Sequence, residues 1–208
     1  MAKSGSKSGN KTGMQHPGAA VAGRTRAGQL AASDPTRALV IARAIPDAWY
    51  RCQALTSIAR AAPEKYMAQA FRQARVAAAE APDAFQQTAV LHATIEAALA
   101  RGLSTLAAEI LREALDRVPL IEPADSRAYA LGLIWSATHA AGAPLRQAIV
   151  DCALAYCDPN HGWRAERLFR AMVHDLATDE AAALIAALPP GRTRDRLARR
   201  TARAGKSA

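Results

Sequence analysis

The sequence Pro-Asp-Ala-aromatic occurs twice, as Pro46–Trp49 and Pro82–Phe85, at an interval of 36 residues. In both places the aspartate is suited to cap a helix, because its side chain accepts a hydrogen bond from a free backbone amide of the first turn. Apolar residues follow each start at helical spacing, and Leu55 and Leu91 occupy matching positions. A helix start that recurs at this interval favours stacked helical hairpins.

Alanine supplies much of the apolar content of the chain. Half of the 208 residues are hydrophobic, but only 5% are aromatic. Alanine is the best helix former, and its small side chain lets helices approach closely. The sequence shows no sustained alternation of apolar and polar residues and no Asn-Gly or Asp-Gly turn between β-branched runs. The composition therefore predicts an all-α protein.

Capping residues and helix breakers divide the chain into about ten helices. Asp34 before Pro35 marks the first start, and Gly102 and Gly142 mark two of the ends. The predicted helices cover approximately residues 34–45, 47–62, 63–81, 83–102, 104–118, 124–141, 144–157, 163–176, 178–188 and 191–205. Because the connections are short, we expect neighbouring helices to pair as about five hairpins.

The sequence predicts three regions. Residues 1–33 should form a disordered basic tail, since their first part is rich in glycine, serine and lysine. Residues 34–190 should form a helical-repeat domain, in which stacked hairpins share a continuous core. Residues 191–208 should form a basic helix that caps this domain, followed by a frayed end.

A second recurrence supports the hairpin interval. Gly102 and Gly142 each end the second helix of a predicted hairpin, and Trp163 opens a helix much as Trp49 does. With an interval of about 36 to 40 residues, residues 34–205 resemble the tetratricopeptide-like and HEAT-like families of helical repeats. The resemblance implies a right-handed α-α superhelix and a general role in binding partners. It implies no site residues, because no unit carries the full tetratricopeptide pattern.

The positive charge lies at the two ends of the chain. The formal net charge is +9, of which residues 1–33 carry +5 and residues 191–208 carry +6, so residues 34–190 carry −2. The body should therefore be close to neutral. Basic ends of this kind attract nucleic acid, acidic protein surfaces or anionic lipid. The alternative is that they only keep the protein soluble.

Two predicted helices carry arginines at helical spacing. Arg164, Arg167 and Arg170 would form a basic ridge on the helix at residues 163–176. The C-terminal helix supplies the rest of the candidate binding surface, namely Arg196, Arg199, Arg200 and Arg203. The alternative is that the ridge pairs with Glu166 and Asp175 or is simply solvated.

The sequence offers no catalytic or metal-binding motif. It lacks a Gly-x-Ser-x-Gly elbow, a phosphate-binding loop and a dinucleotide-binding glycine pattern. His92 and Glu96 lie one turn apart, where a surface hydrogen bond or ion pair is the simpler expectation. Cys152 and Cys157 are five residues apart, so they do not converge on a zinc ion. We therefore predict no catalytic residue, metal or cofactor.

Cysteine number and hydropathy indicate the compartment. Three cysteines, an odd number, argue against a disulfide framework. No apolar stretch approaches the roughly 20 residues of a membrane span. We therefore predict a soluble, cytoplasmic protein. An organellar transit peptide stays an alternative for the first 33 residues, which contain no acid.

The predicted function is the non-enzymatic binding of a protein or peptide partner in the groove of the helical array. The alternative is nucleic-acid binding through the helix at 163–176, the C-terminal helix and the tails, and a HEAT-like DNA repair enzyme follows by analogy of fold alone. Trp49, Phe85 and Trp163 should pack between hairpins, although bases also stack on such rings. Arginines beside exposed rings would favour nucleic acid, whereas mixed polar residues around an apolar strip would favour a peptide.

Overall fold

The computed structural model describes residues 17–139 and 141–204, and every regular element in this part is a helix. The α-helices are α1 (Pro17–Leu30), α2 (Pro35–Arg43), α3 (Ala48–Ala61), α4 (Glu64–Ala79), α5 (Ala84–Ala100), α6 (Ser104–Leu115), α7 (Ala124–Ala137), α8 (Ala143–Tyr156), α9 (Trp163–Asp175), α10 (Thr178–Ala187) and α11 (Arg192–Ala204). A short 3-10 helix, η1 (Val118–Leu120), precedes α7. The predicted all-α class is confirmed, and the bounds of α2 to α11 agree with the predicted helices to within a few residues.

Aspartate caps begin three helices, as the sequence predicts. Asp47 accepts a hydrogen bond from the Tyr50 amide at 3.0 Å, and Asp83 accepts one from the Gln86 amide at 2.8 Å. Asp34 caps α2 in the same way. The Gln86 side-chain amide donates to the Asp83 carboxylate at 3.0 Å, which differs from a capping box because the backbone amide of Asp83 is not its partner.

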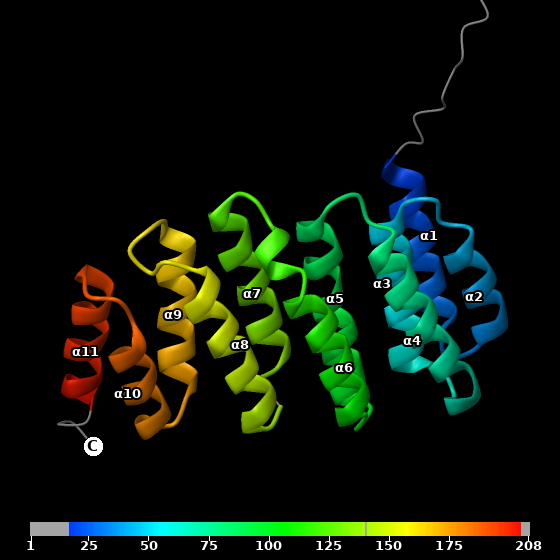
Figure 1. Ribbon diagram of the computed structural model, residues 1–208. Helices are drawn as coiled ribbons and strands as arrows, with labels where there is room; N and C mark the ends of the chain where they lie inside the picture. The colour runs from blue at the N-terminus through cyan, green and yellow to red at the C-terminus, as the bar shows by residue number, and fades with distance from the viewer. Residues whose placement is uncertain (1–16, 140, 205–208) are drawn as a thin grey trace, which may run out of the picture.

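The helices form a row of hairpins, with α1 at one end and α11 at the other (Figure 1). Helices α1, α3, α5, α7 and α9 pack side by side as a first layer. Helices α2, α4, α6, α8 and α10 form a second layer, and each packs against the first-layer helix that precedes it. Helix α11 packs on α9 and α10. Helices in substantial contact are never more than two apart in chain order.

Helix α1 lies within the segment for which the sequence predicts a disordered tail, and for residues 17–30 that prediction is wrong. The helix packs on α2 and α3. Its Arg24 donates a hydrogen bond to Gln53 at 2.9 Å and places its guanidinium 5.6 Å from the centre of the Tyr50 ring. Residues 31–33 of the predicted tail form the turn that follows α1, and residues 1–16 lie outside the described residues.

Small residues let α1 approach its neighbours. Ala20 and Ala27 are buried, and a Cβ atom added to Gly23 would lie 3.1 Å from the side chain of Ile45. A side chain at Gly23 would therefore require the Ile45 side chain to shift by a few tenths of an ångström. These contacts involve alanine and glycine, so the apolar stripe that usually reveals a packed helix is absent from the sequence.

The core consists mainly of alanine, leucine and isoleucine at the helix contacts. Phe71 in α4 and Phe169 in α9 are the largest side chains among those that are fully buried. Close helix packing follows from the many buried alanines, since they present no bulk between the helix backbones. None of the helices in the described ranges has the length and the apolar content that a bilayer crossing requires.

A buried pair of hydroxyl groups joins α3 to α5. The Thr56 and Thr94 Oγ1 atoms are 2.8 Å apart, and both residues are buried. The Cys52 Sγ atom lies 3.8 Å from the Thr94 hydroxyl, and burial raises the pKa of this thiol to about 11. Buried polar groups need partners, so each hydroxyl depends on the other.

Replacing Thr94 with valine should lower the free energy of unfolding by about 1–3 kcal/mol, because it leaves the Thr56 hydroxyl buried without this partner. The change keeps the side-chain shape, so denaturant unfolding measures the loss of the hydrogen bond. The double variant Thr56→Val/Thr94→Val removes both hydroxyls and should be more stable than the single variant. A double variant that is less stable than Thr94→Val would contradict this account.

Arginines link neighbouring hairpins along the row. Arg60 of α3 lies 3.3 Å from Glu96 of α5, and Arg75 of α4 binds both Glu109 and Glu113 of α6. Hydrogen bonds to both carboxylates hold the pKa of Arg75 above its usual value. These interhelical pairs place arginine and carboxylate charges together where helices of neighbouring hairpins meet.

Candidate functional site

The arginines singled out in the sequence lie on two helices at the C-terminal end of the row. Arg164, Arg167 and Arg170 lie on α9. Arg196, Arg199, Arg200 and Arg203 lie on α11, and the side chain of Arg203 is outside the described part of the chain.

The exposed face of α9 combines an indole ring with two arginines. Trp163, Arg167, Arg170 and His174 are all exposed. Their spacing of four, three and four residues places them on one side of the helix. The opposite side packs into the core through Ala165, Leu168, Phe169 and Met172. This division fixes the orientation of α9, so the arginines cannot rotate away from solvent.

Trp163 differs from the other rings that open first-layer helices. Trp49 and Phe85 are half-buried against the core, as predicted. Trp163 is 61% exposed, so the prediction that it packs between hairpins is wrong. The physical reason is the orientation of α9, in which the following residue, Arg164, turns toward α7 and contacts the ring of Tyr129.

Glu166 and Asp175, the partners that the alternative interpretation gives to the α9 arginines, bind other groups. Glu166 pairs with Arg196 of α11. Asp175 accepts a hydrogen bond from Trp135 Nε1 at 2.9 Å and lies 4.0 Å from the Arg146 guanidinium. Within the described residues, no carboxylate lies at ion-pair distance from five of the candidate arginines, namely Arg164, Arg167, Arg170, Arg199 and Arg200.

Helix α11 is held beside α9 by specific contacts. Leu197 is buried, and the Thr193 hydroxyl donates to the carbonyl of Pro159 at 2.9 Å. Arg196 reaches α9 through its ion pair with Glu166. Arg199 and Arg200, three and four residues after Arg196, lie on the same side of α11 as Arg196. We call the resulting surface the α9–α11 strip: Trp163, Arg167, Arg170, Arg196, Arg199 and Arg200.

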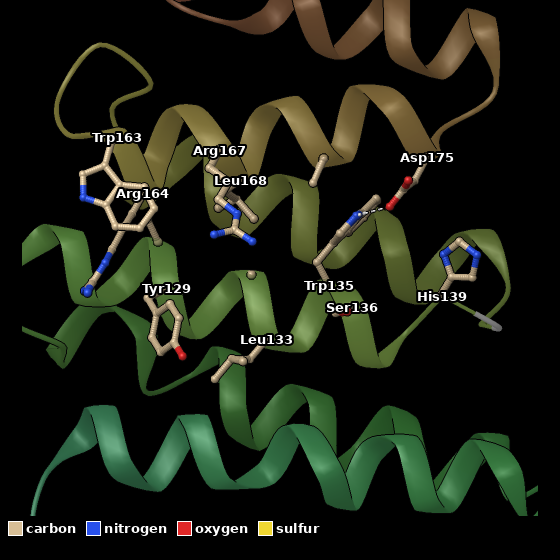
Figure 2. Close-up of a pocket in the computed structure, with 13 residues that line it drawn as sticks. Tyr129, Leu133, Trp135, Ser136, His139, Trp163, Arg164, Arg167, Leu168 and Asp175 are labelled. Carbon is tan, nitrogen blue, oxygen red and sulfur yellow. Dashed lines mark hydrogen bonds between the residues drawn. The ribbon is translucent and has the colours of Figure 1, made fainter.

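A pocket of about 350 Å³ opens between α7 and α9, next to the strip (Figure 2). Arg167 of α9 points into the middle of the pocket (Figure 2). Leu133 and Leu168 supply apolar surface, and Ser136 and His139 add polar groups from α7. The volume is at the lower end of the range of ligand-binding clefts, which is about 300–1,000 Å³.

Planar groups lie in series at one end of the pocket (Figure 2). The Arg164 guanidinium lies 5.0 Å from the centre of the Tyr129 ring and 5.4 Å from that of Trp163. Phe85 of α5 stacks on Tyr129, with the ring centres 6.1 Å apart. The Arg164 Nε atom is buried and has no hydrogen-bond partner among the described residues. This end therefore offers ring faces together with an unused donor.

The other end of the pocket is closed by a hydrogen-bonded carboxylate. Asp175 binds Trp135 Nε1, and its second oxygen lies 2.9 Å from His174 Nδ1. Burial raises the pKa of Asp175, but the hydrogen bonds from His174 and Trp135 and the charges of His174 and Arg146 outweigh this effect and hold it below its usual value. Arg146 also stacks on Trp135 at 4.0 Å from the ring centre. This wall is anionic but largely committed to its own partners.

The remaining candidates of the sequence have separate local contacts. His92 Nδ1 lies 2.5 Å from the carbonyl oxygen of Ala89, and Glu96 pairs with Arg60. No group of three metal-ligating side chains converges anywhere in the described ranges. Burial raises the pKa values of Cys152 and Cys157 to about 12 and about 11, so both stay protonated at neutral pH.

Reasoning from the sequence missed the α7 side of the site. The residues concerned are Tyr129, Leu133, Trp135, Ser136 and His139. A signal was present, because Tyr129 precedes Arg164 by 35 residues, close to the hairpin interval, and His139 precedes His174 by the same number. Matching positions in consecutive first-layer helices lie side by side, so the interval itself points to the two walls of the pocket.

A comparison of the chain with protein-family models, curated proteins and solved structures finds no match.

Proposed function

We propose that this protein is a nucleic-acid-binding module whose contact surface is the α9–α11 strip. The observation that carries the proposal is a set of four exposed arginines on α9 and α11 that have no carboxylate at ion-pair distance among the described residues, beside an exposed indole ring. These arginines are Arg167, Arg170, Arg199 and Arg200. Phosphate groups are the natural counter-charge for such arginines, because guanidinium binds phosphate with charge-assisted hydrogen bonds. The ring supplies a stacking surface that every base can use.

The composition of the surface favours nucleic acid over a peptide partner. A peptide groove would present an apolar strip bordered by mixed polar residues. The strip instead combines five arginines with one exposed ring. Of the acids beside it, Glu166 is already paired with Arg196, and Asp195 lies one helical turn before Arg199 on α11. An acidic protein surface would satisfy the arginines too, but it would make no specific use of Trp163.

Rigid support strengthens this proposal. The strip residues lie on helices whose opposite sides are buried, so their backbones are fixed before a partner arrives. Preorganised contacts lose less conformational entropy on binding than contacts on a mobile loop. Phosphate contacts of this kind position a nucleic acid without reading its sequence, so we expect binding with little sequence preference.

Fluorescence anisotropy with labelled single-stranded and duplex oligonucleotides tests this function. If the four unpaired arginines of the strip contact phosphates, the logarithm of the association constant should fall linearly with the logarithm of salt concentration, with a slope of about 3 for a single strand.

A polyglutamate peptide serves as the competing partner in the same assay. Binding of the peptide in the absence of any nucleic-acid binding would assign the strip to an acidic protein. Failure to bind either oligonucleotide at low salt would refute the proposed function.

A further inference from the structure

The pocket between α7 and α9 opens directly onto the strip, because Trp163 and Arg167 belong to both. A strand that follows the arginines of α9 would therefore pass the mouth of the pocket. The pocket is not explained by phosphate binding, since its floor is apolar and its end wall carries the Asp175 carboxylate. The lining of the pocket therefore suits an uncharged part of the ligand.

Three features define the chemistry of that part. The ring of Trp163 lines the pocket and is 61% exposed, so it is accessible to a planar ligand, whereas the Tyr129 ring, which also lines the pocket, already contacts Phe85 and Arg164. The Arg164 guanidinium lies between the Trp163 and Tyr129 rings and has a buried Nε–H without a partner among the described residues. A flat aromatic ligand with a hydrogen-bond acceptor fits this end.

Charge determines what is attached to this planar group. Arg167 points into the middle of the pocket, and no described carboxylate pairs with it (Figure 2). A negative group bonded to the planar ligand would lie beside this guanidinium. A nucleobase joined to a backbone phosphate combines these properties: a flat aromatic ring, ring and carbonyl acceptors, and an adjacent anion.

We propose that the α7–α9 pocket receives one unpaired base of a single-stranded nucleic acid, which stacks on Trp163 and packs beside Tyr129, while Arg167 binds the neighbouring phosphate. This inference rests on the proposed function and names its substrate class. A base in a duplex already stacks on its neighbours and cannot enter the pocket without being extruded. The protein should therefore bind single strands more tightly than duplexes of the same sequence.

The test uses the full chain and a single-stranded oligonucleotide that carries one fluorescent adenine analogue. Trp163→Ala should weaken single-strand binding by about 5- to 150-fold, the range for losing one base-stacking contact, and Tyr129→Ala should weaken it by less. The fluorescence change of the analogue on binding should shrink in both variants. Trp163→Phe should restore part of the affinity, because the stacking surface is kept.

Tyr156 provides the matched control. It lies at the end of α8 in the second layer and is 42% exposed, so Tyr156→Ala removes a similar ring that does not line the pocket. This variant should bind single strands as the unmodified protein does. Trp163→Ala is the decisive variant should Tyr129→Ala fail to fold, because the Trp163 side chain is mostly in solvent.

The outcomes separate the pocket from the strip. If Trp163→Ala binds the single strand as tightly as the unmodified protein and its binding still depends on salt, the base pocket is refuted. The proposed function would not be affected by that result. Equal affinity of the unmodified protein for single strand and duplex would overturn the pocket as well. Absence of all oligonucleotide binding by the unmodified protein would refute both.

Discussion

Replacing Arg167, Arg170 and Arg200 together with glutamate is expected to reduce nucleic-acid affinity by at least about a hundredfold at physiological salt. This is the order of the loss expected when three contacts with phosphate become repulsive. The three residues are exposed and lie on the two helices of the α9–α11 strip. The slope of the logarithm of the association constant against the logarithm of salt concentration should also decrease in magnitude by about 2 to 3. Anisotropy titrations at several salt concentrations measure both quantities.

A second triple variant separates the location of the charge from its amount. Arg37, Arg72 and Arg112 are exposed on the second-layer helices α2, α4 and α6. Glutamate at these positions changes the net charge by the same amount, away from the strip. This control should lose much less affinity than the strip variant. Equal losses in the two triple variants would mean that the overall field of the protein, and not the strip, attracts the nucleic acid.

Phe169→Ala is expected to lower the free energy of unfolding by about 3–5 kcal/mol, the usual cost of emptying a large aromatic site in a core. Phe169 is fully buried on the side of α9 opposite to the strip. The loss would be a large part of the roughly 5–15 kcal/mol that stabilises a typical domain. Denaturant unfolding gives the size of the effect.

Hydrogen exchange should show where that loss falls. Helices in substantial contact are at most two apart in chain order, so the cavity should accelerate amide exchange in α9, α10 and α11 more than in α3 and α4. Phe71→Ala makes the same chemical change in α4 and should produce the reverse pattern. A uniform increase of exchange in both variants would show instead that the whole row unfolds as one unit.

Helix positions were predictable because local chemistry determines them. Asp34, Asp47 and Asp83 cap helices whose starts need no tertiary information, and glycine and proline end them. Helix α1 was missed because it packs through alanine and glycine, which leave no apolar stripe. Whether such a segment forms a helix depends on the helices against which it packs, and these tertiary contacts cannot be inferred from the sequence of the segment.

The site was only partly predictable for a related reason. Helical spacing gives the face on which Arg167 and Arg170 lie, but it does not show that Glu166 turns to Arg196 and leaves them without acids. The exposure of Trp163 depends on the rotation of α9 in the row, which the contacts with α7 and α11 set. Which side chains meet across neighbouring helices is determined by how the helices pack. The pocket could therefore be found only in the three-dimensional structure.

The two ends of the row do not meet, and this affects how the number of hairpins in such a protein can change during evolution. A barrel or a closed sheet must keep its number of elements, since closure depends on all of them together. Here each hairpin has to match only the hairpins on either side, so duplication or deletion of one unit preserves every other contact. A change in the number of hairpins would therefore disturb only the interfaces at the site of the change, and the arginine-rich end would keep its surface.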